Sequence, residues 1–150
     1  MRLVIQRVRE AVVAIDGEPV SHIAGGMMCL VGVENGDTRE DADWLAQKLA
    51  SMRIFDDEKG VMNIDVRQAG GEVMAVSQFT LHASTRKGNR PSYIRAARPE
   101  VAKPLYEHFC EKVEQLVGKP VARGVFGANM QVSLINDGPV TIIIDSHTRE

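Results

Sequence analysis

The chain has 150 residues, a formal net charge of −2, 44% hydrophobic residues and 25% charged residues. This composition is typical of one globular domain with a buried core, and it gives no global charge that favours nucleic acid, so a nucleic-acid surface has to be local. The longest apolar run, Ile23 to Val33, is too short to cross a bilayer, which needs about 20 residues. Because arginines interrupt the opening MRLVIQRVRE, we expect no secretion signal, a cytoplasmic protein and no membrane partner.

Cysteines and histidines give no sign of a metal site or a disulfide framework. Cys29 and Cys110 lie far apart and form no C-x-x-C pair, so we expect small buried hydrophobic residues in a reducing compartment. The four histidines have no metal-ligand spacing. We therefore expect no metal and no cofactor.

The first third of the chain is predicted to form strands. The segments MRLVIQRV, AVVAID and MMCLVGV are rich in apolar and β-branched residues, and Asp16-Gly17 and Gly25-Gly26 are turn signals. We expect three separate strands here.

An amphipathic helix and a hairpin are expected next. Thr38 can cap the helix, and Asp41 three residues later completes a near relative of the capping box. The segments RIF and VMNIDV flank the turn sequence DDEKG and predict a short hairpin. One face of the expected helix is marked by Trp44, Leu45, Lys48, Leu49 and Met52, with the stem of Lys48 at its margin.

The second half predicts a central strand, a second helix and the closing strands. Glu72 to Phe79 is the strand candidate. The helix is expected to begin near Pro99 and to run towards Gly118, with Pro104 in its first turn. Its apolar stripe comprises Val101, Leu105, Phe109 and Val113. The closing strands are VARGVF, MQVSLI and PVTIIID.

These elements predict an α/β protein in which strands outnumber helices. Two helices have to cover a large sheet area, which favours a mixed or curved sheet with helices layered on one side. No internal repeat, low-complexity tract or linker divides the chain. We expect a single domain over residues 1–150.

Chemistry has to come from segments that carry no familiar motif, because the chain lacks G-x-S-x-G, a P-loop, G-x-G-x-x-G and H-E-x-x-H. The segment SQFTL ends the central strand, where alternation would place Ser77 and Phe79 on one face. Gln78 and Thr80 would then share the other face. Such a cluster can form a small-molecule pocket, and a strand that frays into a loop is the alternative.

The segment from His82 to Pro99 is a basic loop without an acidic residue. Its positive charges are Arg86, Lys87, Arg90, Arg95 and Arg98. With Tyr93 able to stack on a base, this patch suits a phosphate backbone or a single-stranded nucleic-acid end. The alternative is a solvated loop whose arginines pair with acids elsewhere, such as Asp56 to Glu58.

The pair Gly138-Pro139 separates two apolar runs. A turn is the ordinary interpretation of this dipeptide. A cis bond would instead direct a carbonyl where a trans bond cannot, and the glycine would let the backbone approach a ligand closely. Both interpretations are open on these residues alone.

Three segments in this order resemble one family. SQFTL, then TRKGNRPS, then FGANMQVSLINDGPVT are similar to the D-aminoacyl-tRNA deacylases, and SQFTL and NDGPVT match the two signature motifs of that family. The resemblance covers nearly the whole chain, including RLVIQRV near its start. Ser84 and Asn129 depart from the residue that relatives often carry, and both lie outside the two motifs.

The resemblance implies a compact fold with two layers of mixed β-sheet and one helix layer (β/β/α). It implies a homodimer that hydrolyses the ester between a D-amino acid and the 3′-terminal adenosine of tRNA, and it implies no DNA partner. Gly138-Pro139 is expected to be cis and to enter the active site of the other subunit. Its rigid carbonyls would reject L-amino acids by steric clash, whereas glycine would pass.

The resemblance also assigns roles to single residues. The expected substrate-binding residues are Gln78, Phe79, Met130, Gly138 and Pro139, with Met130 either behind the proline or in the ordinary core. The expected supports of the Gly-Pro motif are Arg7, Asn136 and Thr141, and a surface strand residue is the alternative for Arg7. The expected contacts with tRNA are Arg86, Lys87 and Arg90.

Catalysis is assigned to Ser77 and Thr80, and the mechanism stays open between two forms. Thr80 is either a nucleophile or a positioning group. The absence of a His, Glu or Lys in the two motifs favours the second form, in which the ribose 2′-hydroxyl activates water. Backbone N–H groups around Phe79 and Thr80 are candidate oxyanion donors. Two other functions are considered: a non-catalytic module that binds tRNA ends, and a general small-ester hydrolase with Thr80 or Ser77 as nucleophile.

Overall fold

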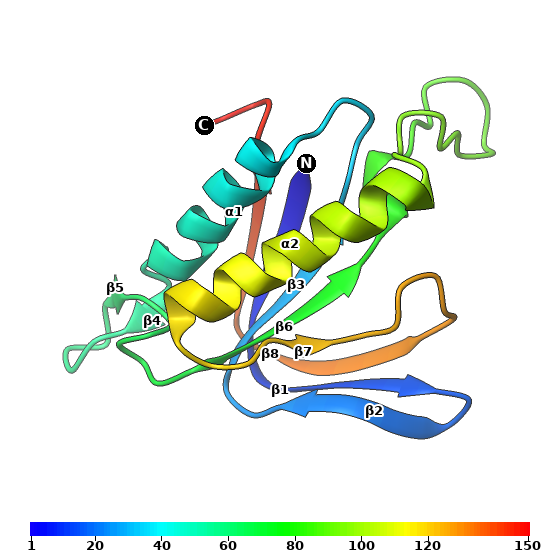
Figure 1. Ribbon diagram of the computed structural model, residues 1–150. Helices are drawn as coiled ribbons and strands as arrows, with labels where there is room; N and C mark the ends of the chain where they lie inside the picture. The colour runs from blue at the N-terminus through cyan, green and yellow to red at the C-terminus, as the bar shows by residue number, and fades with distance from the viewer.

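The structure is a computed structural model that describes residues 1–150. Two helices lie together on one side of a strongly bent sheet (Figure 1). The elements in chain order are β1 (Arg2–Ile15), β2 (Glu18–Ile23), β3 (Gly26–Gly32), α1 (Arg39–Ser51), β4 (Phe55–Asp56), β5 (Met62–Ile64), β6 (Glu72–Ser77), the 3₁₀ turn η1 (Phe79–His82), α2 (Pro99–Val117), β7 (Ala122–Arg123) and β8 (Gln131–Asp145).

The long strand β1 organises the sheet. On one side it pairs antiparallel with β3 along its first half and with β2 along its second half, and β8 runs antiparallel along its other side. β6 and β7 extend the sheet from β3 in parallel, which gives the order β2-β1-β3-β6-β7. The sheet is therefore mixed, as predicted.

Two predicted divisions of the chain are wrong, because β1 and β8 are each one continuous strand. The segments MRLVIQRV and AVVAID both belong to β1, and MQVSLI and PVTIIID both belong to β8. Arg9 and Glu10 interrupt the apolar pattern of β1 because they are exposed where its pairing with β8 shifts register. The polar break therefore marks an irregularity within a strand and not its end.

Two apolar cores lie on opposite faces of β3 and β6. Met27, Cys29 and Val31 face the larger core, which the helices cover, whereas Met28 and Met74 face the smaller one. The smaller core lies inside the bend, where β2 packs across from β6 and β7 without pairing with them. The predicted β/β/α layering is confirmed, and its two sheet layers are halves of one bent sheet.

The predicted start of α1 and both predicted ends of α2 are confirmed, because their signals are local. The Thr38 backbone N–H donates to the Asp41 carboxylate at 2.8 Å, and Gly118 ends α2 in the left-handed conformation. Pro104 lies deeper in α2 than predicted, on the exposed side of the helix. The buried residues of α1 are Ala42, Leu45, Ala46, Leu49 and Ala50, so Trp44 and Lys48 lie at the margin.

The remaining predictions for the fold are mixed. The hairpin is confirmed as β4 and β5, which pair antiparallel. The predicted strand VARGVF is reduced to the two residues of β7. Cys29 and Cys110 are both buried and free, as expected. Neither helix has the length and apolar character needed to cross a membrane.

Candidate active site

The segment SQFTL forms a tight turn and not a continued strand. β6 ends at Ser77, and the next residues form η1. The ladder stops because β3, the parallel partner of β6, ends at Gly32 after the Gln78 N–H has donated to the Val31 carbonyl at 2.8 Å. The prediction that Gln78 and Thr80 lie on one face of a continued strand is therefore wrong.

The turn holds the Thr80 hydroxyl in a hydrogen bond and leaves the backbone N–H groups of Phe79 and Thr80 without a partner. The Gln78 side-chain amide donates to the Thr80 hydroxyl oxygen at 2.5 Å, and no acidic, basic or imidazole group contacts that oxygen. The backbone N–H groups of Phe79 and Thr80 have no hydrogen-bond partner in the chain. Free N–H groups at a turn can stabilise a developing oxyanion.

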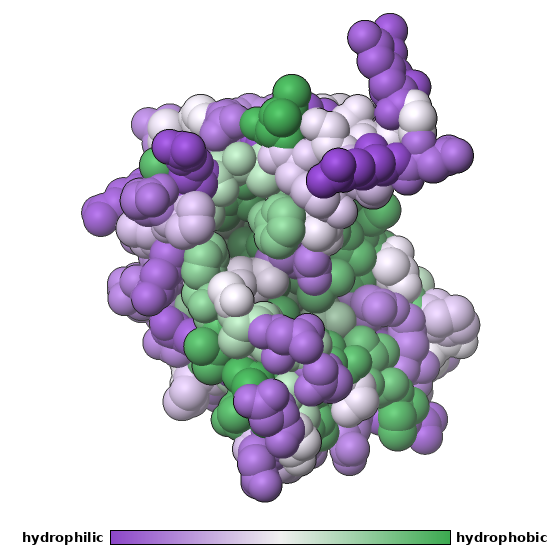
Figure 2. Space-filling model, turned by 90° about the vertical axis from the view of Figure 1, so that its right-hand side faces the viewer, coloured by the Kyte–Doolittle hydropathy of each residue, from purple (hydrophilic) through white to green (hydrophobic).

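A cavity of about 580 Å³ lies on one side of this turn. Ser77, Gln78 and Phe79 form one wall, and Phe126 and Met130 lie in another segment of its lining. Phe79 is 54% exposed and packs edge to face against Tyr93, with ring centroids 5.1 Å apart. Figure 2 shows a hollow in the corresponding face of the molecule, with apolar side chains around it. The size and lining suit a small aromatic ligand.

Met130 lies in the wall of this cavity and not behind Pro139 of its own chain. It packs against the smaller core beside Val132 and Leu134, and it lines the cavity with Phe126. The expected contact with the proline is therefore absent within one chain.

A second cavity, of about 890 Å³, lies on the other side of η1. Thr80 and Leu81 line it together with Trp44 of α1 and Ile143 of β8. The Arg2 guanidinium donates to the Leu81 carbonyl at 2.9 Å and so ties η1 to the start of β1. The turn thus separates an apolar cavity from a wider, mixed one.

The Gly-Pro pair lies on a bulge within β8. Gln6 pairs with Thr141 and Val8 pairs with Asn136, so Arg7 alone faces the four residues 137–140. These extra residues have to project from the ladder, and Gly138 and Pro139 are exposed. The Gly138-Pro139 peptide bond is cis. The ordinary interpretation of a turn between two strands is wrong, because β8 continues on both sides.

Arg7 anchors the base of this bulge. Its side chain is nearly buried, and its Nε donates to the Asp137 carbonyl at 2.9 Å. Nη1 donates to the Ile54 carbonyl at 2.8 Å and lies 3.5 Å from the Asp56 carboxylate. The interpretation of Arg7 as a motif support agrees with this geometry, although the contacted carbonyl precedes the Gly-Pro pair.

Only glycine fits at position 138. Its φ is 133°, which disfavours any residue with a side chain. An added Cβ would lie 2.8 Å from the Val140 side chain, 2.9 Å from its backbone nitrogen and 3.2 Å from Arg7. The Asn136 side-chain oxygen accepts the Val140 N–H at 3.2 Å, which closes the bulge from within.

One chain does not bring the two motifs together. Neither Gly138 nor Pro139 lines either cavity beside η1. Along β1, Arg2 contacts η1 and Arg7 contacts the bulge, and five residues of extended strand span about 16 Å. A site that contains both motifs would need a second copy of the chain.

The basic loop is anchored at its base and open at its tip. Ser84 and Ser92 exchange two backbone hydrogen bonds of 2.8 Å, and Arg95 pairs with Glu34. Figure 1 shows the loop projecting beyond the start of α2. The tip residues Arg86, Lys87 and Arg90 are exposed and form no ion pair. The alternative of arginines paired with acids elsewhere is thus confirmed for Arg95, although its partner is Glu34 and not the segment from Asp56 to Glu58.

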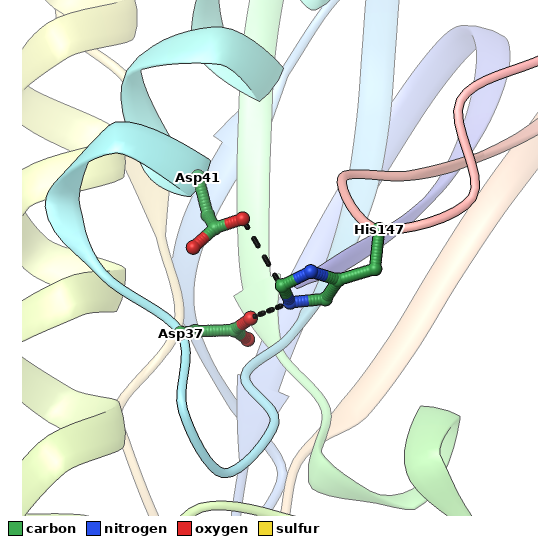
Figure 3. A group of neighbouring side chains, drawn as sticks. All are labelled: Asp37, Asp41 and His147. Atoms are coloured by element: carbon green, nitrogen blue, oxygen red, sulfur yellow. Dashed lines mark hydrogen bonds and ion pairs between the residues drawn. The ribbon is translucent and has the colours of Figure 1, made fainter.

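A cluster of Asp37, Asp41 and His147 lies near the chain ends (Figure 3). The buried Asp37 carboxylate lies 2.7 Å from the Met1 amino group and 2.6 Å from His147 Nε2. Its second oxygen accepts the Glu34 N–H at 2.6 Å. Since a positive amino group already faces this carboxylate, the cluster ties the two ends of the chain together, and we assign no metal to it.

His82, which sequence reasoning did not select, is fully buried at the end of η1. Neither of its ring nitrogens has a hydrogen-bond partner, and burial lowers the pKa of the imidazole. An added Cβ on Gly32 would lie 3.1 Å from its ring. No local signal identifies this residue, because its burial depends on the distant strand β3.

The fold and the cavity define an α/β protein with a substrate-sized site at the end of a central strand. A sequence model of the family described as D-Tyr-tRNA(Tyr) deacylase matches residues 4–145. The chain is 60% identical over 150 residues to a D-aminoacyl-tRNA deacylase of Parabacteroides distasonis and 55% identical over 150 residues to one of Bacteroides thetaiotaomicron, with 100% of each chain covered. The chain therefore belongs to the D-aminoacyl-tRNA deacylase family.

Two solved structures share the fold. A protein named c-Myc DNA Unwinding Element Binding Protein superposes with a TM-score of 0.91 at 36% identity, over 97% of this chain and 98% of that one. A probable eukaryotic D-amino acid tRNA deacylase superposes with a TM-score of 0.80 at 17% identity, over 95% of this chain and 97% of that one. The second likeness concerns the fold alone.

Proposed function

We propose that this chain hydrolyses the ester bond of D-aminoacyl-tRNA and releases a free D-amino acid. The observation that carries this function is the pair of free N–H groups in η1, the turn that lies between the apolar, aromatic cavity and the wider one. The cavity accepts the terminal adenosine, with Phe79 and Phe126 available to stack on the base. A substrate of this kind implies a cytoplasmic enzyme.

The chemical step needs orientation and oxyanion stabilisation more than a strong nucleophile, because an aminoacyl ester is already activated. Water adds to the ester carbonyl, and the N–H groups of Phe79 and Thr80 receive the negative charge on its oxygen. The tetrahedral intermediate then releases the 3′-oxygen of the tRNA, which takes up a proton. The neighbouring ribose 2′-hydroxyl orients and activates the water. Gln78 holds the Thr80 hydroxyl as a positioning group.

Chiral selection belongs to the bulge of a second subunit in this account. Gly138 and Pro139 are exposed and anchored at their base, so their carbonyls can enter the cavity of a partner as a rigid unit. The apolar side chains of Ile135 and Ile143, 55% and 68% exposed on β8, favour a homodimer. Rigid carbonyls on one side of the α-carbon exclude an L side chain by clash and leave a D side chain free.

Glycine tests this steric account, because it presents a hydrogen on both sides of its α-carbon. We expect the protein to hydrolyse glycyl-tRNA at a measurable rate. Release of glycine from charged tRNA at high protein concentration checks this expectation. Intact glycyl-tRNA under those conditions would show that selection is not purely steric.

Two substrates and a binding assay separate the proposed function from its alternatives. We expect rapid release of D-tyrosine from D-tyrosyl-tRNA in the presence of a metal chelator, and slow hydrolysis of D-tyrosine methyl ester. A general esterase would cleave both at similar rates. A binding module would retain charged tRNA on a filter and release no amino acid.

A further inference from the structure

Gln6 lies beneath both ends of the Gly-Pro bulge. It is half-buried on β1, directly before Arg7. Its side-chain oxygen accepts hydrogen bonds from the Asn136 amide nitrogen and from the Thr141 hydroxyl, the latter at 3.1 Å. Asn136 is the last paired residue of β8 before the bulge, and Thr141 is the first one after it. The side-chain oxygen of Gln6 thus joins the two paired residues that flank the bulge.

The contact with Gln6 also fixes the direction of the Asn136 amide. An asparagine side chain offers a donor NH₂ on one side and an acceptor oxygen on the other. With its NH₂ on Gln6, the Asn136 oxygen faces the Val140 N–H, which it accepts at 3.2 Å. Asn136 therefore links Gln6 on β1 to Val140, the residue directly after Pro139, through two consecutive hydrogen bonds.

Gln6 and Arg7 act on opposite faces of the same strand. Successive side chains of a strand point to opposite faces. Arg7 holds the Asp137 carbonyl, while Gln6 holds the side chains of Asn136 and Thr141. Arg7 thus holds the bulge itself, while Gln6 holds the two paired residues at its ends.

We propose that Gln6 is a positioning residue for stereochemical selection: by accepting both hydrogen bonds, it sets the orientation of the Gly-Pro carbonyls. This inference rests on the proposed function of the bulge as selector. Without the acceptor, the Asn136 amide keeps only the Val140 N–H and a long contact of 3.5 Å with the Thr141 hydroxyl, and the bulge loses one of its two anchors. The carbonyls then reject L-aminoacyl groups less well and orient D-aminoacyl groups less well, while tRNA binding is unchanged.

The test compares Gln6→Met with Gln6→Glu. Methionine keeps the length of the side chain and removes the acceptor, whereas glutamate keeps an acceptor oxygen for both donors. We expect Gln6→Met to lower the ratio of D-tyrosyl-tRNA to L-tyrosyl-tRNA hydrolysis by about tenfold. The KM for tRNA stays at the wild-type value, and Gln6→Glu restores most of the ratio. Gln131→Met, at the exposed far end of β8, is the matched control and leaves the ratio unchanged.

Three outcomes would overturn the role of Gln6. The first is an unchanged ratio in Gln6→Met. The second is an equal loss in Gln6→Met and Gln6→Glu, which indicates a packing effect. If Gln6→Met does not fold, Thr141→Val can be measured instead, because it removes one of the two donors to Gln6. The third outcome is an unchanged ratio of D-tyrosyl-tRNA to L-tyrosyl-tRNA hydrolysis in Thr141→Val. A wild-type protein that does not separate D from L substrates overturns the proposed selector itself, which distinguishes the two failures.

Discussion

At the scale of single residues, the surroundings of Thr80 bear on the choice between two mechanisms. Its hydroxyl oxygen accepts a hydrogen bond from Gln78, which withdraws electron density from the atom that a nucleophilic mechanism would use. No carboxylate, imidazole or amine contacts the hydroxyl to remove its proton. The geometry therefore supports a positioning role for Thr80 and water as the attacking group.

Replacing Thr80 by Ala or Val tests this assignment. We expect kcat for D-tyrosyl-tRNA to fall by about tenfold or less, because the backbone N–H donors of η1 remain. Circular dichroism and thermal melting control for folding. A loss of about 10⁴-fold or more in a folded variant would instead identify Thr80 as the nucleophile.

His82 predicts a pH dependence of stability. Burial lowers the pKa of its imidazole and outweighs the attraction of Glu34, whose carboxylate lies 3.9 Å from Nδ1. The unfolded chain binds a proton at about pH 6.5, whereas the folded chain keeps His82 neutral to lower pH. The free energy of unfolding is therefore expected to fall as the pH drops below about 6.5.

Urea titrations at pH 7.5 and 5.5 measure this effect. We expect His82→Leu to lose less stability between these pH values than the wild type does. His22→Gln, at an exposed position, is the control and should keep the wild-type difference. An unchanged pH difference in His82→Leu would contradict the assignment.

At the scale of elements, the sequence predicts the helices better than the strands. The signals that begin and end the helices, at Thr38, Pro99 and Gly118, lie within or beside the helix itself. The sequence pattern divides β1 at a polar pair that is exposed at a register shift, and it divides β8 at its bulge. The continuity of both strands depends on pairing between distant segments, which local hydrophobicity does not report.

The candidate site shows the same limit. Motif resemblance identified SQFTL and NDGPVT, but the turn η1 depends on where β3 ends. The size of the bulge depends on the register of β1 against β8, and Gln6 is visible as a contact only in the folded chain. Residues in the motifs were therefore predictable, whereas the residues that support them from other strands were not, with Arg7 as the exception.

Gly138→Ala tests the bulge as an element. The positive φ and the contacts with Val140 and Arg7 would force the bulge to move. We expect D-tyrosyl-tRNA hydrolysis to fall by about 100-fold, as for a misplacement of about 1 Å. Gly17→Ala is the matched control, because Gly17 also has a positive φ but has no atom within 4 Å of the added Cβ. Near wild-type rates in Gly138→Ala would contradict the account of the bulge.

At the scale of the whole molecule, positive charge is concentrated at the tip of the loop that we propose as the tRNA contact. The net charge is −2, yet three exposed and unpaired cations, Arg86, Lys87 and Arg90, gather at the tip of one loop. The loop follows η1 directly, so its tip can meet the acceptor-stem phosphates of a tRNA whose end lies in the cavity. Binding through phosphate groups weakens as salt rises.

A triple substitution of Arg86, Lys87 and Arg90 by Ala tests this surface. We expect the KM for charged tRNA to rise by about tenfold or more, and its salt dependence to flatten by nearly one logarithmic unit of slope for each phosphate that the variant no longer neutralises. The rate at saturation should be preserved. The matched control replaces Arg39, Lys59 and Lys103, which are exposed elsewhere, and should leave KM unchanged. Equal effects of both triples would indicate only a general charge effect.

In the proposed assembly, η1 supplies the chemistry, and the Gly-Pro bulge of a second copy supplies the chiral choice. Hydrolysis of D-tyrosyl-tRNA and L-tyrosyl-tRNA side by side, without added metal, tests it most directly. We expect rapid release of D-tyrosine while L-tyrosyl-tRNA stays intact. Equal release from both would contradict the selector, and release from neither would contradict the enzyme.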